Sequence, residues 1–431
     1  MSLTTDRRRF LQQSLVGGAS VAVAASAPHG WLHALAREAS DQDRILIVIQ
    51  LSGGNDGLNT VVPYRDEAYQ RSRPKLAIAA DSLVKLNDAL GLHPATRTLE
   101  AALSDGRFTI VQGVGYQQPN RSHFESMDIW NTCQRKEHRA GQGWLGRWLS
   151  NERNAESDAS ESLALHLGRE QQPLAFAGRD VTVPSIASLK QFRLQLGDGN
   201  ALRQEVMRLT HSHSKGANRE LIPSRESTTF ENASENQSEL LNFVQSSTRM
   251  ALEASQQLET AASATGSSDE FPGSELGEKL HIISQLITSG LSTRVYYVTL
   301  DGFDTHAQQP AAHAALLRQW SEAQSTLLKV LKDRGFADRV LVMTFSEFGR
   351  RLAENASEGT DHGAAAPVFL AGPQLKTPVV GDQPSLTDLD DGDLKFHTDF
   401  RSVYATIIEK WFTGESENIL GAKYAALDLF A

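Results

Sequence analysis

Short strings of carboxylate and imidazole side chains lie directly after or before apolar runs of the sequence. Asp56 follows the first run, and Asp304 and His306 follow a later one. Asp361 and His362 stand just ahead of another run. Carboxylate oxygens and imidazole nitrogens together suit Zn²⁺ or Mn²⁺. Carboxylates a few Å apart repel each other unless a cation lies among them. The sequence therefore predicts a divalent metal site, and two such ions would stabilise the attacking and leaving oxygens of a displacement at phosphorus or sulfur.

Each string by itself also has a purely structural explanation. Residues 53–56 fit a tight turn with an Asp helix cap, and Ser122 fits a helix cap as well. Glu347 and Arg350 fit a solvated ion pair. The joint occurrence of the strings beside apolar runs favours the metal site.

Five apolar runs predict the strands that would position these side chains. The first reads ILIVIQL at 45–51 and is continuous rather than alternating, as in strands that are buried on both faces. Strands that alternate with helices predict an α/β fold, a three-layer α/β/α sandwich on a largely parallel sheet. Sites in such sheets form at the carboxyl ends of the strands, where most of the strings fall. The predicted strands are 44–51, 107–112, 294–300, 339–345 and 367–371, and the main helical patterns are 93–103, 120–133, 312–331 and 400–412.

Residues 1–36 are predicted to be a twin-arginine signal peptide. Arg7 and Arg8 form the pair, an apolar stretch follows at 15–27, and a small-x-small site favours cleavage after Ala36. The stretch is too short for a membrane span. An uncleaved amphipathic helix is the alternative. Because such signals carry folded cargo, we expect the twin-arginine (Tat) translocase as a partner and a periplasmic or extracellular location.

The composition excludes several classes of protein. The 431 residues carry a net charge of −10 without a dense basic stripe, which argues against nucleic-acid binding. One cysteine, Cys133, excludes a disulfide framework and a multi-Cys zinc site. No apolar run outside the signal is long enough for a transmembrane segment, so no integral membrane domain is expected in the mature chain.

The mature chain, 37–431, is predicted to be one domain with an insertion. Residues 211–274 are rich in Ser, Glu, Asn and Gln, and apolar side chains between Leu240 and Leu258 mark one helix face. Residues 261–274 are a polar linker. We interpret about 151–275 as a helical insertion or cap that packs on the sheet edge.

Six ordered strings resemble a family of exported bacterial proteins known as domain of unknown function 1501. The resemblance implies membership of the alkaline phosphatase, sulfatase and phosphoglycerate mutase superfamily. It therefore implies an alkaline phosphatase-like fold and a metal-dependent phospho- or sulfo-ester site, with no known substrate. The strings are LSGGNDGLNTVVPY (51–64), NRSHFESMDIW (120–130), DGFDTH (301–306), TFSEFGRR (344–351), GTDHG (359–363) and HTDFRSVYATIIEKW (397–411).

The resemblance also implies roles for single residues. Asp56 resembles the first-strand Asp that bridges the metals, and Ser122 lies where the superfamily places its nucleophile. Asp304 and His306 resemble the Asp and His of one metal, although they are spaced as Asp-x-His rather than Asp-x-x-x-His. Glu347-Phe348 replaces the superfamily's Asp-His pair, and Asp361-His362 follows later, so either pair or both are candidate ligands. Zinc or manganese would activate Ser122 or water, and Arg350 would bind the anionic group of the substrate.

These observations predict a metal-dependent hydrolase or transferase for a phosphate or sulfate ester, with a small-molecule, glycan or lipid ester as substrate. The alternative is a non-catalytic relative of the same fold that binds a glycan, a lipid headgroup or a protein. A formylglycine sulfatase is disfavoured because neither Cys133 nor Ser122 is followed by x-Pro-x-Arg. An SGNH esterase is disfavoured because no Gly-Asp-Ser precedes Gly54-Asn55-Asp56.

Overall fold

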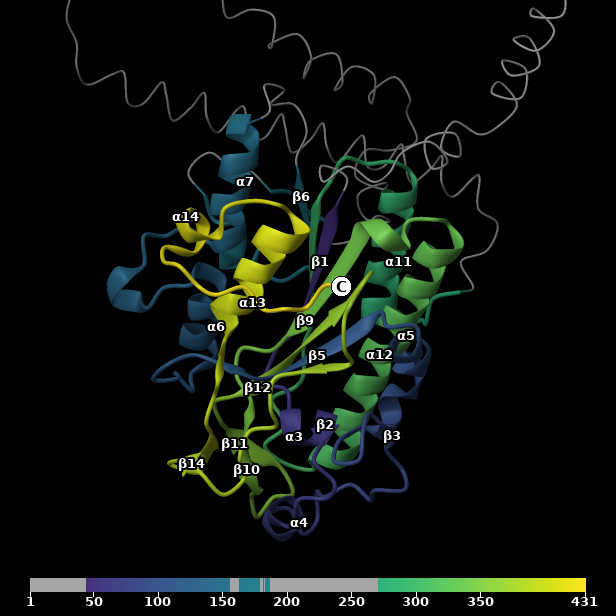
Figure 1. Ribbon diagram of the computed structural model, residues 1–431, viewed down its shortest axis with the longest axis vertical. Helices are drawn as coiled ribbons and strands as arrows, with labels where there is room; N and C mark the ends of the chain where they lie inside the picture. The colour runs from purple at the N-terminus through teal and green to yellow at the C-terminus, as the bar shows by residue number, and fades with distance from the viewer. Residues whose placement is uncertain (1–43, 156–162, 179–180, 182, 187–269) are drawn as a thin grey trace, which may run out of the picture.

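The computed structural model describes residues 44–155, 163–178, 181, 183–186 and 270–431 (Figure 1). The predicted signal peptide and the helix face between Leu240 and Leu258 lie outside the described residues, and so does most of the predicted insertion.

A nine-stranded sheet forms the centre of the molecule, in the order β13-β5-β12-β9-β1-β8-β6-β7, with β16 paired to β5. All five predicted strands belong to it. They are β1 (Ile45–Leu51), β5 (Phe108–Gly115), β8 (Val295–Leu300), β9 (Val340–Phe345) and β12 (Ala366–Ala371). The others are β6 (Ala164–Leu167), β7 (Ser185–Ile186), β13 (Val379–Val380) and β16 (Thr398–Asp399).

The sheet is parallel except at β12, which confirms the predicted largely parallel sheet. Strand β1 runs parallel to both neighbours, with Ile49 opposite Val298 of β8 and Thr344 of β9. Strand β12 runs antiparallel to β9 and β5. A hairpin of β10 (Arg350–Glu354) and β11 (Thr360–His362) connects β9 to β12, so the chain re-enters the sheet from the edge at which β9 ends.

Two apolar cores lie on opposite faces of the sheet, which gives the predicted three layers (Figure 1). Ile47 and Ile49 pack in the core under the helices α11 and α12, whereas Leu46 and Val48 pack in the core under α6, α7 and α13. Because both faces are covered, the strand sequence is continuously apolar. The helices on the first face are α5 (Glu100–Ser104), α11 (Glu275–Thr288) and α12 (Gln309–Asp333). Those on the second face are α6 (His123–Thr132), α7 (Trp144–Ala155), α13 (Phe400–Thr406) and α14 (Ser416–Leu420).

Two predicted helical segments are less regular than expected. The 93–103 pattern forms a 3₁₀ segment, η2 (Pro94–Leu99), before α5, because Pro94 at the helix start and Thr96 with non-helical dihedrals interrupt it. The 400–412 pattern divides into α13 and a π-helical turn, η6 (Ile407–Trp411). The short 3₁₀ segments are η3 (Lys136–His138), η4 (Leu174–Phe176) and η5 (Ala337–Arg339).

The predicted insertion contributes to the sheet. Strands β6 and β7 lie within 151–275, and β6 pairs in parallel with β8 so that both extend the sheet beyond β1. No strand was predicted there, because β6 has only four residues and includes His166.

Small elements surround the carboxyl ends of β1, β8 and β9, in the lower part of Figure 1. Leu58, Val62, Tyr69 and Leu352 belong to a third, smaller core at this end. The elements are α3 (Gly57–Thr60), β2 (Val61–Val62), α4 (Glu67–Ser72), β3 (Val84–Lys85), β4 (Gly91–Leu92), β14 (Leu389–Asp390) and β15 (Asp393–Leu394).

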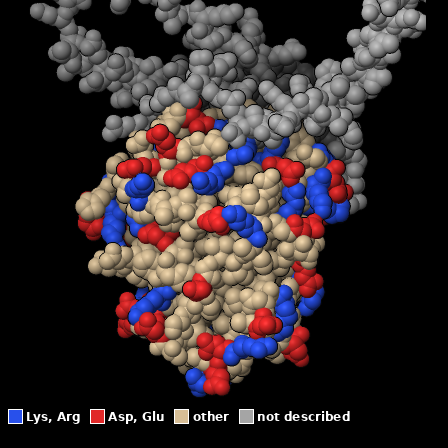
Figure 2. Space-filling model, in the orientation of Figure 1, with Lys and Arg blue, Asp and Glu red and all other residues tan. Residues whose placement is uncertain are grey.

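The surface mixes charges of both signs. Acidic and basic side chains are interspersed over the face shown in Figure 2. Among the described helices, none is long and apolar enough to cross a membrane.

Candidate metal centre

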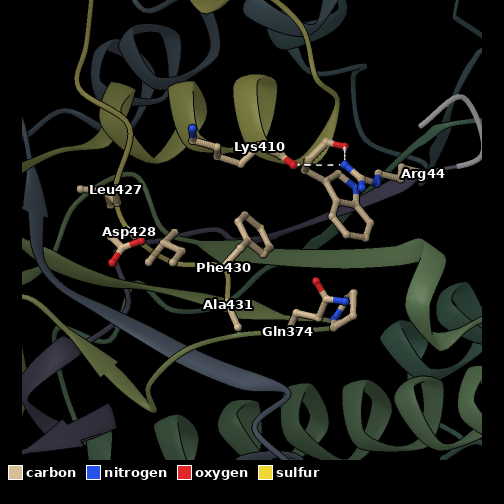
Figure 3. Close-up of a pocket in the computed structure, with 10 residues that line it drawn as sticks. Arg44, Gln374, Lys410, Leu427, Asp428, Phe430 and Ala431 are labelled. Carbon is tan, nitrogen blue, oxygen red and sulfur yellow. Dashed lines mark hydrogen bonds between the residues drawn. The ribbon is translucent and has the colours of Figure 1, made fainter. Parts of the chain in front are cut away.

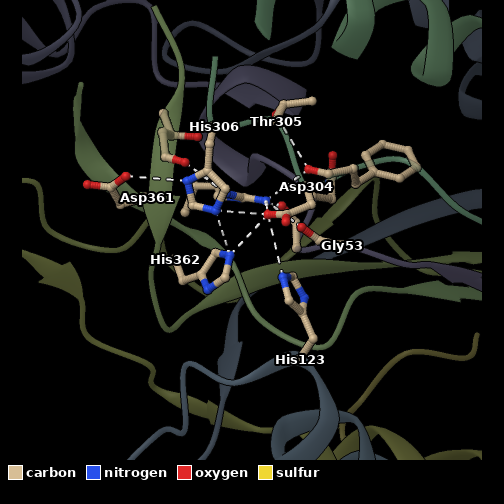
Figure 4. A network of polar contacts seen from close by, with 12 residues as sticks. Gly53, His123, Asp304, Thr305, His306, Asp361 and His362 are labelled. Atoms are coloured by element: carbon tan, nitrogen blue, oxygen red, sulfur yellow. Dashed lines mark hydrogen bonds and ion pairs between the residues drawn. The ribbon is translucent and has the colours of Figure 1, made fainter. Parts of the chain in front are cut away.

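Three imidazoles converge on one carboxylate oxygen at the carboxyl edge of the sheet (Figure 4). The oxygen is Oδ1 of Asp304, in the loop that follows β8. It lies 3.0 Å from Nε2 of His306, 3.0 Å from Nε2 of His362 and 3.5 Å from Nε2 of His123. His306 comes from the same loop as Asp304, His362 ends β11, and His123 begins α6. Elements far apart in the sequence therefore bring four potential ligand atoms together.

The opposite ring nitrogen of each imidazole has its own acceptor. Nδ1 of His123 lies 2.7 Å from Oε1 of Glu347, and Nδ1 of His362 lies 2.9 Å from the carbonyl oxygen of Arg121. Nδ1 of His306 lies 3.4 Å from Oδ1 of Asp361. A carbonyl only accepts, so Nδ1 of His362 donates to Arg121, while Nε2 faces Asp304 and is the atom that a metal ion would bind. Acceptors of this kind behind metal-bound histidines fix the ring orientation.

The donor set fits a divalent metal ion. Ligand atoms of His123, Asp304 and His362 lie within 4.8 Å of one another. Nε2 of His123 is buried and has no hydrogen-bond partner within the described part of the chain. A buried polar atom without a partner is costly, and a metal ion would supply the partner. Three imidazole nitrogens and one carboxylate oxygen suit Zn²⁺ or Mn²⁺.

The charges around Asp304 keep it ionised. Burial acts to raise the pKa of Asp304, but hydrogen bonds from His362 and Arg350 and the Arg350 charge outweigh it and lower the pKa to about 2. The hydrogen bond to Glu347 raises the pKa of His123. A bound dication would displace a proton from that imidazole, as metals do from their ligands.

A buried aromatic ring supports two of the imidazoles. The ring centre of Phe348 lies 4.8 Å from that of His123 and 4.7 Å from that of His362. Phe348 follows Glu347 directly, so one dipeptide packs against His123 and also holds its Nδ1. Phe348, the second residue of the Glu347-Phe348 pair, thus packs against the imidazoles of His123 and His362.

The residues predicted from the sequence lie at the centre of the cluster, directly behind its imidazoles, or outside it. Asp304, His306 and His362 lie at the centre as predicted. Glu347 and Asp361 lie one step further out, because the oxygen that each presents to the site contacts an imidazole Nδ1. Glu347 is buried, and its Oε1 also accepts from the backbone N–H of Gly53 at 2.9 Å.

Asp56 does not join the cluster. It is fully buried, and its Oδ2 accepts from Arg73 at 2.5 Å and from Gln309 at 2.6 Å. Its Oδ1 caps α3 by accepting from Asn59 N–H. Burial acts to raise the pKa of Asp56, but Arg73 outweighs it and lowers that pKa. The guanidinium takes the place that a metal ion was predicted to occupy.

Arg350 faces the protein rather than a substrate. Its side chain is fully buried, and all three guanidinium nitrogens donate to protein oxygens. The predicted role in binding the substrate anion is therefore corrected, because a substrate has no access to this side chain in the structure.

Ser122 is exposed and precedes α6 without capping it. Within the described residues, no hydrogen bond joins its hydroxyl to a base. Ser122 was predicted from the sequence, whereas its neighbour His123 was not predicted as a ligand. The signal for His123 was its place in the NRSHF string, one residue after the predicted nucleophile.

A cavity of about 350 Å³ lies elsewhere, between the start of β1 and the C-terminal residues (Figure 3). Arg44, Lys410, Trp411 and Phe430 are among its lining residues. Because Arg44 precedes β1 and the metal centre follows the carboxyl end of β1, the cavity and the centre lie at opposite ends of that strand.

Fold and site together define an α/β protein with a candidate metal centre at the carboxyl edge of a largely parallel sheet. The chain belongs to the family described as protein of unknown function (DUF1501), whose pattern matches residues 43–411. No curated protein matches the chain.

Several solved structures of esterase and sulfatase type align with most of the chain at low identity. A lipoteichoic acid synthase, LtaP, from Listeria monocytogenes is 10% identical, with a TM-score of 0.37 over 90% of this chain and 74% of its own. The PsFucS1 sulfatase from Pseudoalteromonas sp. is 11% identical, with a TM-score of 0.36 over 89% of this chain and 70% of its own. The phosphonate monoester hydrolase SpPMH from Silicibacter pomeroyi is 10% identical, with a TM-score of 0.35 over 89% of this chain and 78% of its own.

Proposed function

We propose that the protein is an exported, metal-dependent hydrolase or transferase that acts on a phosphate or sulfate ester. The observation that carries the proposal is the convergence of His123, His306 and His362 on Asp304 at the carboxyl edge of the sheet. Sites in open α/β sheets form at this edge. The residues that would hold the ion are these four.

We propose one ion rather than the two expected from the sequence. The described residues gather one group of free ligand atoms, and Asp56 is paired with Arg73. When bound, the ion supplies Lewis-acid chemistry, because it polarises an ester oxygen and lowers the pKa of water. Zinc or manganese fits the donors equally well.

The side chains of the centre leave room for a substrate. The side chains of Asp304 and His306 are 48% and 45% exposed. Solvent and an ester therefore reach the side of the cluster that is not backed by Glu347 and Phe348.

We propose water as the nucleophile in place of Ser122. A serine hydroxyl is a weak nucleophile unless a base lies within hydrogen-bond reach. Ser122 has no such base within the described residues, and its neighbour His123 directs Nδ1 to Glu347 and Nε2 to Asp304. The imidazoles are thus engaged as ligands rather than as a base for the serine.

A binding protein without turnover is the second candidate. Two observations favour it. Arg350 pairs internally with Asp304 and Asp56 with Arg73, and no hydrogen bond joins the Ser122 hydroxyl to a base among the described side chains. Such a protein would still bind the ion and use it to hold an anionic group of a glycan, a lipid or a protein.

Metal content and turnover together separate these readings. Protein purified after folding in the cytoplasm is analysed for transition metals, reconstituted with Zn²⁺ or Mn²⁺, and assayed with p-nitrophenyl phosphate, bis-p-nitrophenyl phosphate and p-nitrophenyl sulfate. We expect about one equivalent of metal and hydrolysis of at least one ester. His362→Ala should lose both metal and hydrolysis. His397→Ala, whose Nε2 contacts the carbonyl of Asp382 and not the cluster, should lose neither.

Each outcome has a clear meaning. Bound metal without hydrolysis of any ester supports the binding protein. Wild-type protein that retains less than about a tenth of an equivalent after reconstitution contradicts both candidates, because both place an ion on Asp304.

A further inference from the structure

Arg350 connects the segments that carry the metal centre. Its Nε donates to the carbonyl of Gly54 at 2.6 Å, and its Nη1 donates to the carbonyl of Thr360 at 2.7 Å. Its Nη2 donates to the carbonyls of Gly53 and Phe303 and to Oδ1 of Asp304. One guanidinium thus holds the loop after β1, the loop after β8 and the strand β11.

Each of these contacts lies next to a residue of the centre. Phe303 directly precedes Asp304, and Thr360 lies two residues before His362 in β11. Arg350 is also the residue opposite His362 in the pairing of β10 with β11. Gly53 donates its N–H to Glu347, which holds Nδ1 of His123. A displacement of Arg350 would therefore reach Asp304, His362 and His123 together.

The backbone is shaped to let the guanidinium approach. A Cβ on Gly54 would lie 3.3 Å from Nε of Arg350 and 2.4 Å from the ring of Phe348. A Cβ on Gly53 would lie 2.4 Å from the backbone nitrogen of Asp304. Both glycines have a positive φ, which other residues adopt at a cost. The two glycines thus allow the loop to lie directly against the site.

The physical chemistry of the guanidinium suits this role. A buried charge is costly unless it is paired and its donors are satisfied. Here a carboxylate and four carbonyls satisfy a rigid planar group, which is pre-organised for several acceptors at once. An ammonium group has no such planar fork, so Arg350→Lys keeps the charge but loses most of the contacts.

We propose that Arg350 is a positioning residue that sets the metal affinity of the centre by holding its ligands in place before the ion arrives. The inference rests on the proposed metal site but not on the identity of the ester. It replaces the substrate-binding role predicted from the sequence.

The test is a Co²⁺ titration followed by visible absorption, on wild-type protein, Arg350→Lys and Arg73→Lys. We expect about 10- to 100-fold weaker Co²⁺ binding for Arg350→Lys, together with altered ligand-field bands. Arg73 is the matched control, because its side chain is equally buried and none of its acceptors, on Asp56, Asn59, Arg351 and Leu352, is one of the four ligands. Arg73→Lys should lower the melting temperature and leave Co²⁺ affinity within about twofold, since its contacts lie outside the ligand shell.

Co²⁺ affinity and bands of Arg350→Lys that match those of the wild type would overturn the inference. An equal loss of affinity in Arg73→Lys would also overturn it, because the effect would then be general destabilisation. Wild-type protein that binds no Co²⁺ would instead defeat the proposed function, and the inference with it.

A second measurement covers the case in which Arg350→Lys does not fold. Hydrogen exchange of the wild type is followed over residues 301–306 and 359–363 with and without Co²⁺. Ligands that are already held should exchange slowly in metal-free protein, with little change when Co²⁺ binds. Fast exchange that Co²⁺ slows more than about tenfold would show that the ion, and not Arg350, orders the site.

Discussion

At the scale of single residues, Asp304 links the proposed metal ligands to the buried guanidinium of Arg350. Its Oδ1 contacts three imidazoles and Arg350, and those contacts lower its pKa to about 2 in spite of burial. It therefore stays ionised at any pH at which the protein is expected to work. A change at this side chain should act on charge and geometry together.

Asp304→Asn separates charge from shape. The amide keeps the volume of the carboxylate but loses the negative charge, so we expect loss of bound metal with little change in the fold. A ligand at 100 times its dissociation constant stabilises the folded state by about 2.7 kcal/mol, and the variant should lose that increment. Metal analysis and thermal unfolding with and without Zn²⁺ measure it. An unchanged response to Zn²⁺ would remove Asp304 from the ligand set.

Glu347→Gln tests the outer contact of His123. The amide still offers an oxygen to Nδ1 of His123 but removes the charge that raises the pKa of that imidazole. We expect metal affinity to fall about tenfold, the lower end of the effect of such outer contacts. Isothermal titration with Zn²⁺ measures the change. Asp388→Asn, which alters an exposed carboxylate paired with Lys395, is the control and should bind normally.

At the scale of elements, the loop after β1 must lie close to the loop after β8. Gly53 has a φ of +115°, and its N–H and carbonyl contact Glu347 and Arg350. The parallel pairing of β1 with β8 brings the two loops to the same edge. Strand topology therefore decides which loops meet, and the glycine decides how closely.

Gly53→Ala should disturb this loop. Its new Cβ would lie 2.4 Å from the backbone nitrogen of Asp304, in addition to the cost of the positive φ. We expect the free energy of unfolding to fall by about 2–4 kcal/mol. Gly290→Ala is the matched control, since Gly290 also has a positive φ, +85°, but open space around the added atom. The control should cost about 1 kcal/mol, and urea denaturation distinguishes the two. Equal losses of the free energy of unfolding in the two variants would contradict a role for the close approach of Gly53 to Asp304.

At the scale of the whole molecule, two buried histidines make stability depend on pH. Burial lowers the pKa of His93 to about 4 and that of His313 to about 3. Both are thus neutral in the folded protein at a pH at which an unfolded histidine is half protonated, about 6.5. The unfolded state binds more protons in this window, so stability rises with pH.

We expect the free energy of unfolding to have its full value above about pH 6.5 and to fall as the pH drops toward about 4. The shift of His93 alone corresponds to about 3 kcal/mol across that window. Urea denaturation at pH 4.5 and pH 7 measures the difference. His93→Asn should reduce the pH dependence, while His138→Asn, on an exposed 3₁₀ segment, should not. Parallel curves for wild type and His93→Asn would contradict the assignment.

Export concerns the whole precursor. Arg7 and Arg8 are the proposed recognition pair, so Arg7→Lys together with Arg8→Lys should leave folded precursor in the cytoplasm. Cell fractionation measures the location, and mass spectrometry of the mature N-terminus tests cleavage after Ala36. Normal periplasmic delivery of the double variant would refute the twin-arginine signal.

The layers, the five long strands and several residues of the candidate metal centre could be predicted from the sequence. Continuous apolar runs such as 45–51 report burial on both faces, a local property that survives in any packing of the chain. Parallel strands bring their carboxyl ends to one edge, which is why Asp304 and His306 were predicted from their place after an apolar run. His362 precedes an apolar run and reaches the same edge because β12 runs antiparallel to its neighbours.

The other residues of the candidate centre and their pairings depend on how the elements pack. His123 reaches the site because α6 packs on the sheet beside Glu347, a contact between residues 224 positions apart. Asp56 does not join the candidate centre because it forms a buried ion pair with Arg73. The side chain of Arg350 points into the protein because its guanidinium donates to carbonyls of three segments. A carboxylate binds a metal or a guanidinium according to which cation the packing places beside it. Residue type and spacing do not contain that information.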